Sequence, residues 1–432
     1  MLRRLRRASL AHLRAEAEAV DPRELARFLP SWQNVDARRP AGAGPDRLRE
    51  ALVPLQGVAL TPEVWERDVL PRRLGAYSPA WLDELCTAGE LVWIGAGALA
   101  RSGGRVALYF REDVRLAGPP PANLKLEPPA GETQDAIREL LGQRPCFWLD
   151  LVSELDLGAE ELHSALWDLA WSGEVTNDAF APLRAPRLRS VQREQQRRGR
   201  RFAARRAAAG QAVQGRWSLT EPLFQNAPSA GPRLRAQAEL MLERYGIVTR
   251  ETVLAEGIPG GFASLYGEMS NLEMLGTTRR GYFVEGLGGA QFALPGAVER
   301  LRSLPSPEGR FLLLAATDPA NPYGAGVSWP KRGGGPGGRR PSRTPGAYVL
   351  LRDGEPLLFI ERGGRGILRL RELEGEELAE AVGELARAVQ EGLLPRLGIE
   401  RLDGEPVIGS KIEETLIAAG FSRQPRRLVA SA

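Results

Sequence analysis

A short phrase repeats three times along this 432-residue chain and restricts the folds open to it. At residues 82–90, 166–174 and 272–276, leucines three apart end an apolar helical pattern shortly before a glycine. In every copy a segment with strand character follows. Helix, turn, helix, glycine stop and hairpin is the order of a winged helix, a helix-turn-helix followed by a β-wing. We therefore predict an array of nucleic-acid-binding modules.

Length and composition set outer bounds on the architecture. A chain of 432 residues is too long for one hydrophobic core and should divide into roughly three or four domains. Its hydrophobic share of 43% and charged share of 26% are typical of soluble proteins. No apolar run approaches the roughly 20 residues that span a bilayer, and the basic start lacks the apolar stretch of a signal peptide. We expect a cytoplasmic, nucleoid-associated location and no membrane partner.

Cysteine and histidine are scarce, and this restricts the chemistry. Cys86 and Cys146 lie in apolar helical patterns with neither a CxxC partner nor a histidine at ligand spacing, as buried small hydrophobic residues would. Since His12 and His163 are the only histidines, zinc sites and histidine-based triads are nearly excluded. We expect no metal and no cofactor, so catalysis would have to use carboxylates or amides.

Arginine carries almost all of the positive charge. The net charge is +4, and the chain has only three lysines. Arginine binds phosphates and stacks on bases, so this bias suits DNA contact, although GC-rich codon usage is the simpler explanation of the bias itself. The densest basic stretch, within residues 184–216, is either a phosphate-binding arm or the solvated face of a connecting helix. The candidate DNA-binding residues there and after the third glycine stop are Arg193, Arg197, Arg198, Arg200, Arg201, Arg205, Arg206, Arg279 and Arg280.

Proline, glycine and charge patterns divide the chain into regions. Thr61-Pro62 and Ser78-Pro79 combine a capping residue with a proline at the first helical position, so they mark two helix starts. We predict a helical N-terminal region at 1–60, winged helices at 61–117 and 130–185, a basic linker or helix at 186–230, a third winged helix at 231–303 and a C-terminal domain at 308–432.

The second module differs from the others in charge. Its third helix begins with Glu160 and Glu161, and acidic residues at that position repel phosphates. Trp167 and Trp171, spaced i and i+4 on the same helix, are predicted to belong to the core rather than to a base-stacking surface. We therefore predict that this module packs against protein instead of DNA.

The C-terminal region changes character from helical to strand-rich. Asp353-Gly354, between two apolar runs, is a strong hairpin signal. Strand patterns at 311–315, 347–351, 357–361 and 366–370 are accompanied by helical patterns near 375–390 and 412–418. The predicted fold class is α+β, with tandem winged-helix domains followed by a β-barrel-like α+β domain.

Longer runs carry a resemblance to a known family. They include Gly-Glu-Leu-Val-Trp at 89–93 and the runs 104–111, 166–184, 256–262, 280–292 and 317–323. In these runs the chain resembles the C-terminal portion of large helicase-related (Lhr) bacterial DNA-repair helicases, over nearly its whole length. The resemblance implies tandem winged helices plus a β-barrel, a relationship to winged-helix DNA glycosylases of the alkylation-repair type, and uracil excision. The phosphate-binding loop of a motor, G-x-x-x-x-G-K-[ST], does not occur, so we expect no ATP hydrolysis by this chain.

One cluster has the chemistry that base excision needs. A glycosylase flips a base out of the stack and stabilises a cationic sugar or activates water, usually with a carboxylate. Asp318, beside Asn321 and Tyr323 in a proline-rich loop, combines an acid, an amide and a ring, and we predict these three as catalytic. The alternative is an aspartate that stabilises its own loop by capping backbone amides.

Two functions remain open from the sequence. The first is a DNA-binding repair module, with glycosylase activity on uracil or damaged bases in single-stranded DNA. The alternative is a non-catalytic DNA-binding and oligomerisation module that supports a separate helicase motor. Both predict single-stranded or forked DNA as a partner, and a helicase motor or further copies of the chain would be additional partners.

Overall fold

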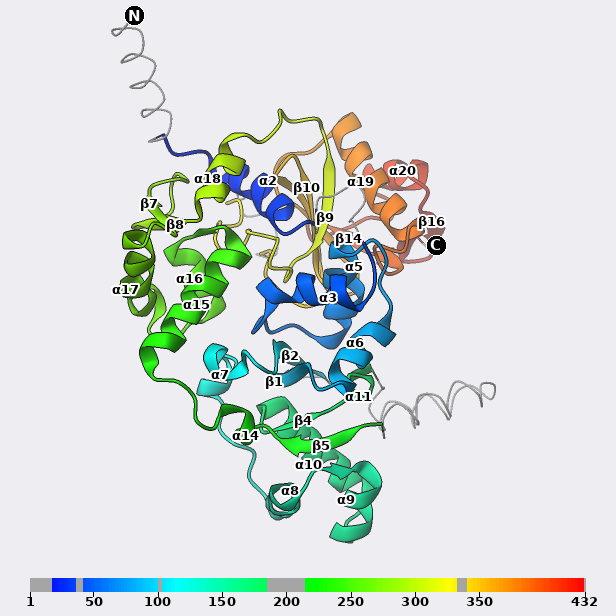
Figure 1. Ribbon diagram of the computed structural model, residues 1–432. Coiled ribbons are helices and arrows are strands. Elements are labelled where there is room, and N and C mark those ends of the chain that lie inside the picture. The colour runs from blue at the N-terminus through cyan, green and yellow to red at the C-terminus, as the bar shows by residue number, and fades with distance from the viewer. Residues whose placement is uncertain (1–17, 36–41, 100–102, 185–213, 332–339, 431–432) are drawn as a thin grey trace, which may run out of the picture. The chain divides into compact units, whose positions relative to one another are not determined.

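The computed structural model describes residues 18–35, 42–99, 103–184, 214–331 and 340–430 (Figure 1). The chain divides into two compact units, which are described separately below. Unit 1 consists of residues up to 40, 67–72 and 241–432, and unit 2 consists of residues 41–66 and 73–240. None of the helices in the described ranges combines the length and apolar character needed to cross a membrane.

The first part of unit 2 is a set of short helices followed by a long hairpin. Its elements are α3 (Pro45–Leu52), η1 (Val53–Leu55), α4 (Pro62–Val64), α6 (Pro79–Thr87), β1 (Leu91–Leu99), β2 (Gly103–Phe110) and α7 (Val114–Ala117). Between α4 and α6 the chain forms the π-helical turn η2 (Trp65–Val69) and α5 (Leu70–Arg73), in which residues 67–72 belong to unit 1. Thr61 caps α4 as predicted, because its hydroxyl accepts the Val64 N–H at 3.4 Å.

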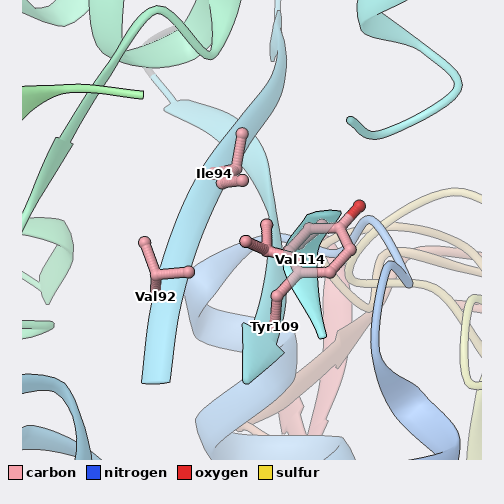
Figure 2. Packing of buried hydrophobic residues seen from close by; sticks show 5 residues of the cluster. Val92, Ile94, Tyr109 and Val114 are labelled. Carbon is pink, nitrogen blue, oxygen red and sulfur yellow. The ribbon is translucent and has the colours of Figure 1, made fainter. Parts of the chain in front are cut away.

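The hairpin carries a small apolar core of its own. β1 and β2 pair antiparallel from Leu91 opposite Phe110, with a register shift between Gly95 and Ala98. Figure 2 shows Val92 and Ile94 on β1 beside Tyr109 on β2 and Val114 at the start of α7. All four side chains are at most 2% exposed, so the hairpin is fixed by burial as well as by its ladder.

The second part of unit 2 follows the order helix, strand, helix, helix, strand, strand. Its main elements are α8 (Glu132–Gln143), β3 (Cys146–Phe147), α9 (Trp148–Leu155), α10 (Ala159–Ser172), β4 (Val175–Asn177) and β5 (Arg216–Leu219). The short helix α11 (Ala181–Arg184) follows β4, and α14 (Glu221–Phe224) follows β5. β5 lies between β3 and β4 and pairs antiparallel with both. Trp167 stacks on Trp171 with centroids 4.9 Å apart, and both are buried, which confirms the prediction that they belong to the core.

A third module repeats that order. Its elements are α15 (Ala230–Tyr245), β6 (Ile247–Val248), α16 (Arg250–Glu256), α17 (Gly261–Met274), β7 (Arg279–Gly281) and β8 (Gln291–Ala293). The strand β8 pairs antiparallel with both β6 and β7. The predicted glycine stops of the three repeats, Gly89, Gly173 and Gly276, all have φ between 75° and 86°, a left-handed conformation that glycine adopts without strain.

The C-terminal part of unit 1 is a mixed sheet with two covering helices. The six-stranded sheet has the order β15 (Glu405–Pro406), β14 (Arg401–Leu402), β12 (Gly366–Arg369), β11 (Glu355–Ile360), β10 (Tyr348–Arg352), β9 (Phe311–Ala315). A three-stranded sheet joins β13 (Leu397–Ile399), β17 (Arg427–Ala430) and β16 (Ser422–Gln424), and the helices are α19 (Gly375–Gln390) and α20 (Ile412–Ala418). Asp353-Gly354 forms the predicted hairpin turn between β10 and β11.

The α+β class is confirmed, but the expected barrel is not closed in the described part of the chain. β12 pairs parallel with β14 while the other pairs are antiparallel, so the sheet is mixed. β9 and β15 remain at its two edges. The physical reason is length, because the two-residue strands β14 and β15 are too short to carry the sheet round to β9.

Two further helices of unit 1 precede the six-stranded sheet in the chain. α2 (Pro22–Trp32) is capped by Asp21, whose Oδ1 accepts the Arg23 N–H at 2.7 Å. α18 (Pro295–Arg302) follows β8 and leads into β9. Figure 1 shows α2 and α18 next to the end of the sheet formed by β9 and β10.

Candidate functional site

The predicted catalytic residues lie together in the turn that follows β9. Asp318 Oδ1 accepts the Ala320 N–H at 2.8 Å. Asn321 Nδ2 donates to the Ala316 carbonyl at 3.0 Å, and its Oδ1 accepts the Tyr323 N–H at 3.1 Å. The exposed fractions of Asp318, Asn321 and Tyr323 are 1%, 0% and 4%. The structure therefore brings the three residues together and uses their polar atoms to hold the turn.

The tyrosine of this cluster is held by both its hydroxyl and its ring. Tyr323 Oη donates to the Gly354 carbonyl at 2.7 Å, which ties the turn to the β10–β11 hairpin. Its ring stacks on Trp329 with centroids 5.8 Å apart, and Trp329 meets Phe359 edge-on. Burial raises the pKa of the Tyr323 hydroxyl. The ring is therefore part of an aromatic stack inside the protein.

An arginine clamps the backbone of the same turn. Arg343 donates from Nη1 to the Asn321 carbonyl at 2.6 Å, and from Nη2 to the carbonyls of Thr317 at 3.2 Å and Asp318 at 3.1 Å. Burial lowers the pKa of Arg343, and nearby Tyr245, Glu256 and Asp318 act in the opposite direction. The guanidinium thus supplies positive charge beside Asp318 while it fixes the turn.

A second buried carboxylate is electrostatically coupled to Asp318. Asp68 is 5% exposed; its Oδ1 accepts the Tyr348 hydroxyl at 3.1 Å, and Arg67 binds both of its oxygens at 3.0 Å. Burial raises the pKa of Asp68, the hydrogen bonds from Arg67 and Tyr348 oppose that change, and the charge of Asp318 adds to it. A buried carboxylate with a raised pKa is typical of acid–base sites, and also occurs in structural networks. Asp68 could not be assigned to this site from the sequence, because it lies far from Asp318 in the chain.

A cavity of about 370 Å³ lies close to this turn within unit 1. Its lining comes from α2, from the link between α18 and β9, and from the β10–β11 turn. Gly354, whose carbonyl holds the Tyr323 hydroxyl, is part of that lining. The cavity is large enough for a small molecule or a single nucleotide. Sequence reasoning did not find it, because its walls come from three separate segments.

The two wing arginines of the third module are exposed and already paired. Arg279 Nη1 lies 2.8 Å from Glu299 Oε1. Arg280 lies 3.3 Å from Glu273 through Nε and donates to the Tyr266 hydroxyl at 3.1 Å. A phosphate would have to replace these carboxylates, which exposed pairs permit at little cost. The other predicted DNA-binding residues lie outside the described residues: Arg193, Arg197, Arg198, Arg200, Arg201, Arg205 and Arg206.

The described residues contain no group of three or more His, Cys, Asp or Glu side chains that could hold a metal ion. Cys86 and Cys146 are buried, unpaired thiols, in agreement with their expected role as small hydrophobic residues. The chemical groups available around Asp318 are therefore carboxylates, amides, hydroxyls and guanidinium groups.

Repeated helix-turn-helix units with β-wings, joined to a mixed sheet, define a protein of the winged-helix class. The family description "Large helicase-related protein, winged-helix domain" matches residues 20–111 and, separately, residues 227–310. The fold resembles the solved Streptomyces sahachiroi DNA glycosylase AlkZ, with a TM-score of 0.50 at 15% identity, covering 89% of this chain and 100% of that chain. At that identity the likeness concerns the fold alone.

Two curated relatives align with almost the entire chain. It is 39% identical over 455 residues to "Lhr helicase/ probable uracil glycosylase" of Mycolicibacterium smegmatis, covering 99% of this chain and 29% of the relative. It is 34% identical over 468 residues to "Lhr helicase/uracil glycosylase" of Escherichia coli, covering 99% and 30%. The chain thus spans less than a third of the length of these relatives. It is homologous to the C-terminal winged-helix region of the large helicase-related family, as the sequence runs indicated.

Proposed function

We propose that this chain is a DNA-binding repair module with DNA glycosylase activity toward uracil or damaged bases in single-stranded DNA. The observation that carries the proposal is the alignment of 99% of the chain with two relatives whose names include uracil glycosylase. The AlkZ-like fold is consistent with it. Because the motor motif is missing from the sequence, ATP hydrolysis is not part of this function.

The proposed partner is single-stranded or forked DNA. The module at 132–219 repeats the element order of the module at 230–293, so we propose it as a further winged helix. The arginine-rich stretch at 193–206 would supply phosphate contacts that are independent of sequence. A helicase motor and further copies of the chain are proposed as additional partners, in the cytoplasm and at the nucleoid.

The proposed catalytic group is Asp318, with Asn321 and Tyr323 positioning it. Support comes from their location in one turn, from the charge of Arg343 on the same turn and from the electrostatic coupling of Asp318 to Asp68. Since Asp318 is 1% exposed, a nucleotide can reach its carboxylate only when this turn opens. A carboxylate so placed would stabilise the cationic sugar that forms as the glycosidic bond breaks.

The test is excision from a uracil-containing single-stranded oligonucleotide, read as alkali-cleaved product on a gel. Asp318→Asn keeps an oxygen that can accept the Ala320 N–H and removes the negative charge. We expect excision to fall by about 100-fold or more, because the transition state loses its counter-charge. DNA binding, followed by fluorescence anisotropy, should persist or tighten as repulsion of phosphates disappears.

Two controls separate catalysis from folding. Asp46→Asn changes a carboxylate whose side chain is 97% exposed and should leave excision unchanged. The Tm of Asp318→Asn should stay within a few degrees of the unmodified chain, so that lost excision cannot be attributed to unfolding. Equal excision by both variants would show that the activity is real and that Asp318 is not its acid.

The second candidate function is a non-catalytic DNA-binding and oligomerisation module that supports a helicase motor. One observation favours it: the Asp318 carboxylate, the Asn321 amide and the Tyr323 hydroxyl each hold backbone groups of the turn or of the neighbouring hairpin. If the purified chain binds DNA but excises neither uracil nor alkylated bases, this second function replaces the first.

A further inference from the structure

The cavity in unit 1 has walls of two chemical kinds. Ala26 and Pro30 on α2 and Leu351 on β10 are buried apolar residues of the lining. The lining also contains polar and charged residues, among them Ser31 and Arg300. A lining that combines apolar residues with a few polar groups is usual for a pocket whose ligand is part ring and part charge.

The lining contains more arginines than carboxylates. Three arginines, Arg27, Arg300 and Arg310, face two carboxylates, Glu308 and Asp353. Asp353 is already engaged, because its oxygens accept the backbone N–H groups of residues 308, 309 and 310 at 3.3, 2.7 and 3.2 Å. These three backbone donors hold the Asp353 carboxylate and reduce the repulsion that it would exert on an anion in the cavity.

Arg27 and Arg300 differ in how their charge is used. Arg27 binds both oxygens of Glu24 at 3.0 and 2.8 Å and donates to the Pro305 carbonyl, so it ties α2 to the link before β9. Arg300 has no carboxylate within ion-pair distance in the described ranges. It donates to the Ser31 carbonyl at 3.2 Å and lies over the Trp32 ring at 5.5 Å. Arg300 is therefore a positioned cation with charge left for a ligand.

The size and position of the cavity point to one class of anion. A volume of about 370 Å³ admits one nucleotide. A base can reach such a cavity only from a single strand or after leaving the duplex stack. Arginine holds phosphate by parallel N–H donors, and bases bind readily against apolar side chains.

We propose that this cavity binds one nucleotide of single-stranded DNA, with its phosphate on Arg300 and its base against the wall formed by Ala26, Pro30 and Leu351. The inference rests on the proposed DNA-binding function and deepens it by naming where one nucleotide is held. It does not depend on catalysis by Asp318.

The first experiment measures anisotropy of fluorescein-labelled (dT)8 with the full chain and three variants. Arg300→Gln removes the cation, and Ser306→Trp fills the cavity from an exposed position of its lining. Arg302→Gln is the matched control, since Arg302 is on the same helix but does not line the cavity. We expect Kd to rise at least fivefold for the first two variants and to stay within twofold for the control. The Tm of each variant shows that it is folded.

The second experiment identifies the ligand class by calorimetry with the full chain. Thymidine 5′-monophosphate should bind at least ten times more tightly than either thymidine or inorganic phosphate, because only it engages both walls. Equal binding of inorganic phosphate, or no binding of the nucleotide, would overturn the inference.

The two proposals fail in different ways. If the unmodified chain does not bind (dT)8 at all, the DNA-binding function itself is wrong, and the inference falls with it. If the chain binds (dT)8 and neither Arg300→Gln nor Ser306→Trp changes the Kd, the DNA-binding function stands and the nucleotide cavity is wrong.

Discussion

The modules at 132–219 and 230–293 share one order of elements, but their third helices present different surfaces. α10 and α17 are each 14 residues long. Seven residues of α10 are buried, against three of α17. The first turn of α10 contains Glu160 and Glu161, whereas the first turn of α17 has no acidic residue. The helix that would read a DNA groove is thus packed and acidic in one module and open in the other.

Aromatic packing explains the difference. Trp217 on β5 meets Trp167 and Trp93 edge-on at 5.6 and 6.1 Å, so the indole of α10 is enclosed by its own unit. On α17, Tyr266 and Met274 are 39% and 79% exposed. The comparison teaches that element order determines the topology of such a module, while the side chains of the third helix determine whether a face remains for DNA.

The largest expected effect tests whether the module at 132–219 depends on its aromatic packing for stability. Trp217→Ala removes a fully buried indole from the centre of the β3–β5–β4 sheet and its contacts with two tryptophans. We expect the free energy of unfolding, measured in urea, to fall by about 3–5 kcal/mol. Met274→Ala on α17 should change it by less than about 0.5 kcal/mol, since that side chain is exposed. Similar losses of unfolding free energy for both variants would contradict the distinction between a packed α10 and an exposed α17.

Features set by neighbouring residues could be predicted from the sequence. The glycine stops at Gly89, Gly173 and Gly276, the cap at Thr61 and the Asp353-Gly354 turn all depend on local backbone conformation, and all are present. The closure of the C-terminal sheet could not be predicted in this way, because it depends on the lengths and partners of strands far apart in the chain. A hydrophobic pattern identifies strands but does not fix which of them pair.

The next effect tests whether the exposed face of α17 binds DNA. Tyr266 presents a partly exposed ring on α17, next to the wing residue Arg280. If bases stack on it, Tyr266→Ala should weaken binding of single-stranded DNA about tenfold, since stacking contributes roughly 1–3 kcal/mol per base. Tyr266→Phe keeps the ring and should restore most of the affinity. Anisotropy titrations give both values, and an unchanged Kd for Tyr266→Ala would leave α17 without a role in DNA binding.

The candidate site was predictable in part for the same physical reason. Asp318, Asn321 and Tyr323 are close in sequence, so their location in one turn followed from the chain itself. Their burial, the coupling to Asp68 and the cavity beside Gly354 depend on segments separated by tens to hundreds of residues. Residue type indicates what chemistry a cluster could perform, whereas tertiary packing determines whether a substrate reaches it.

The smallest expected effect compares the acidic residues of the two helices. Glu160 and Glu161 lie in the first turn of α10, where carboxylates interact favourably with the helix dipole. If that module does not contact DNA, changing both to Gln should alter the Kd for single-stranded DNA by less than about twofold, and reduce stability only slightly. On α17 the matched double change, Glu268→Gln with Glu273→Gln, should tighten binding several-fold, because Glu273 pairs with Arg280 and its loss frees that guanidinium for phosphate. Anisotropy at constant salt compares the two pairs directly. Tighter binding after the α10 change would mean that this helix also lies near phosphates. Both modules would then contact DNA and would differ only in how strongly they bind it.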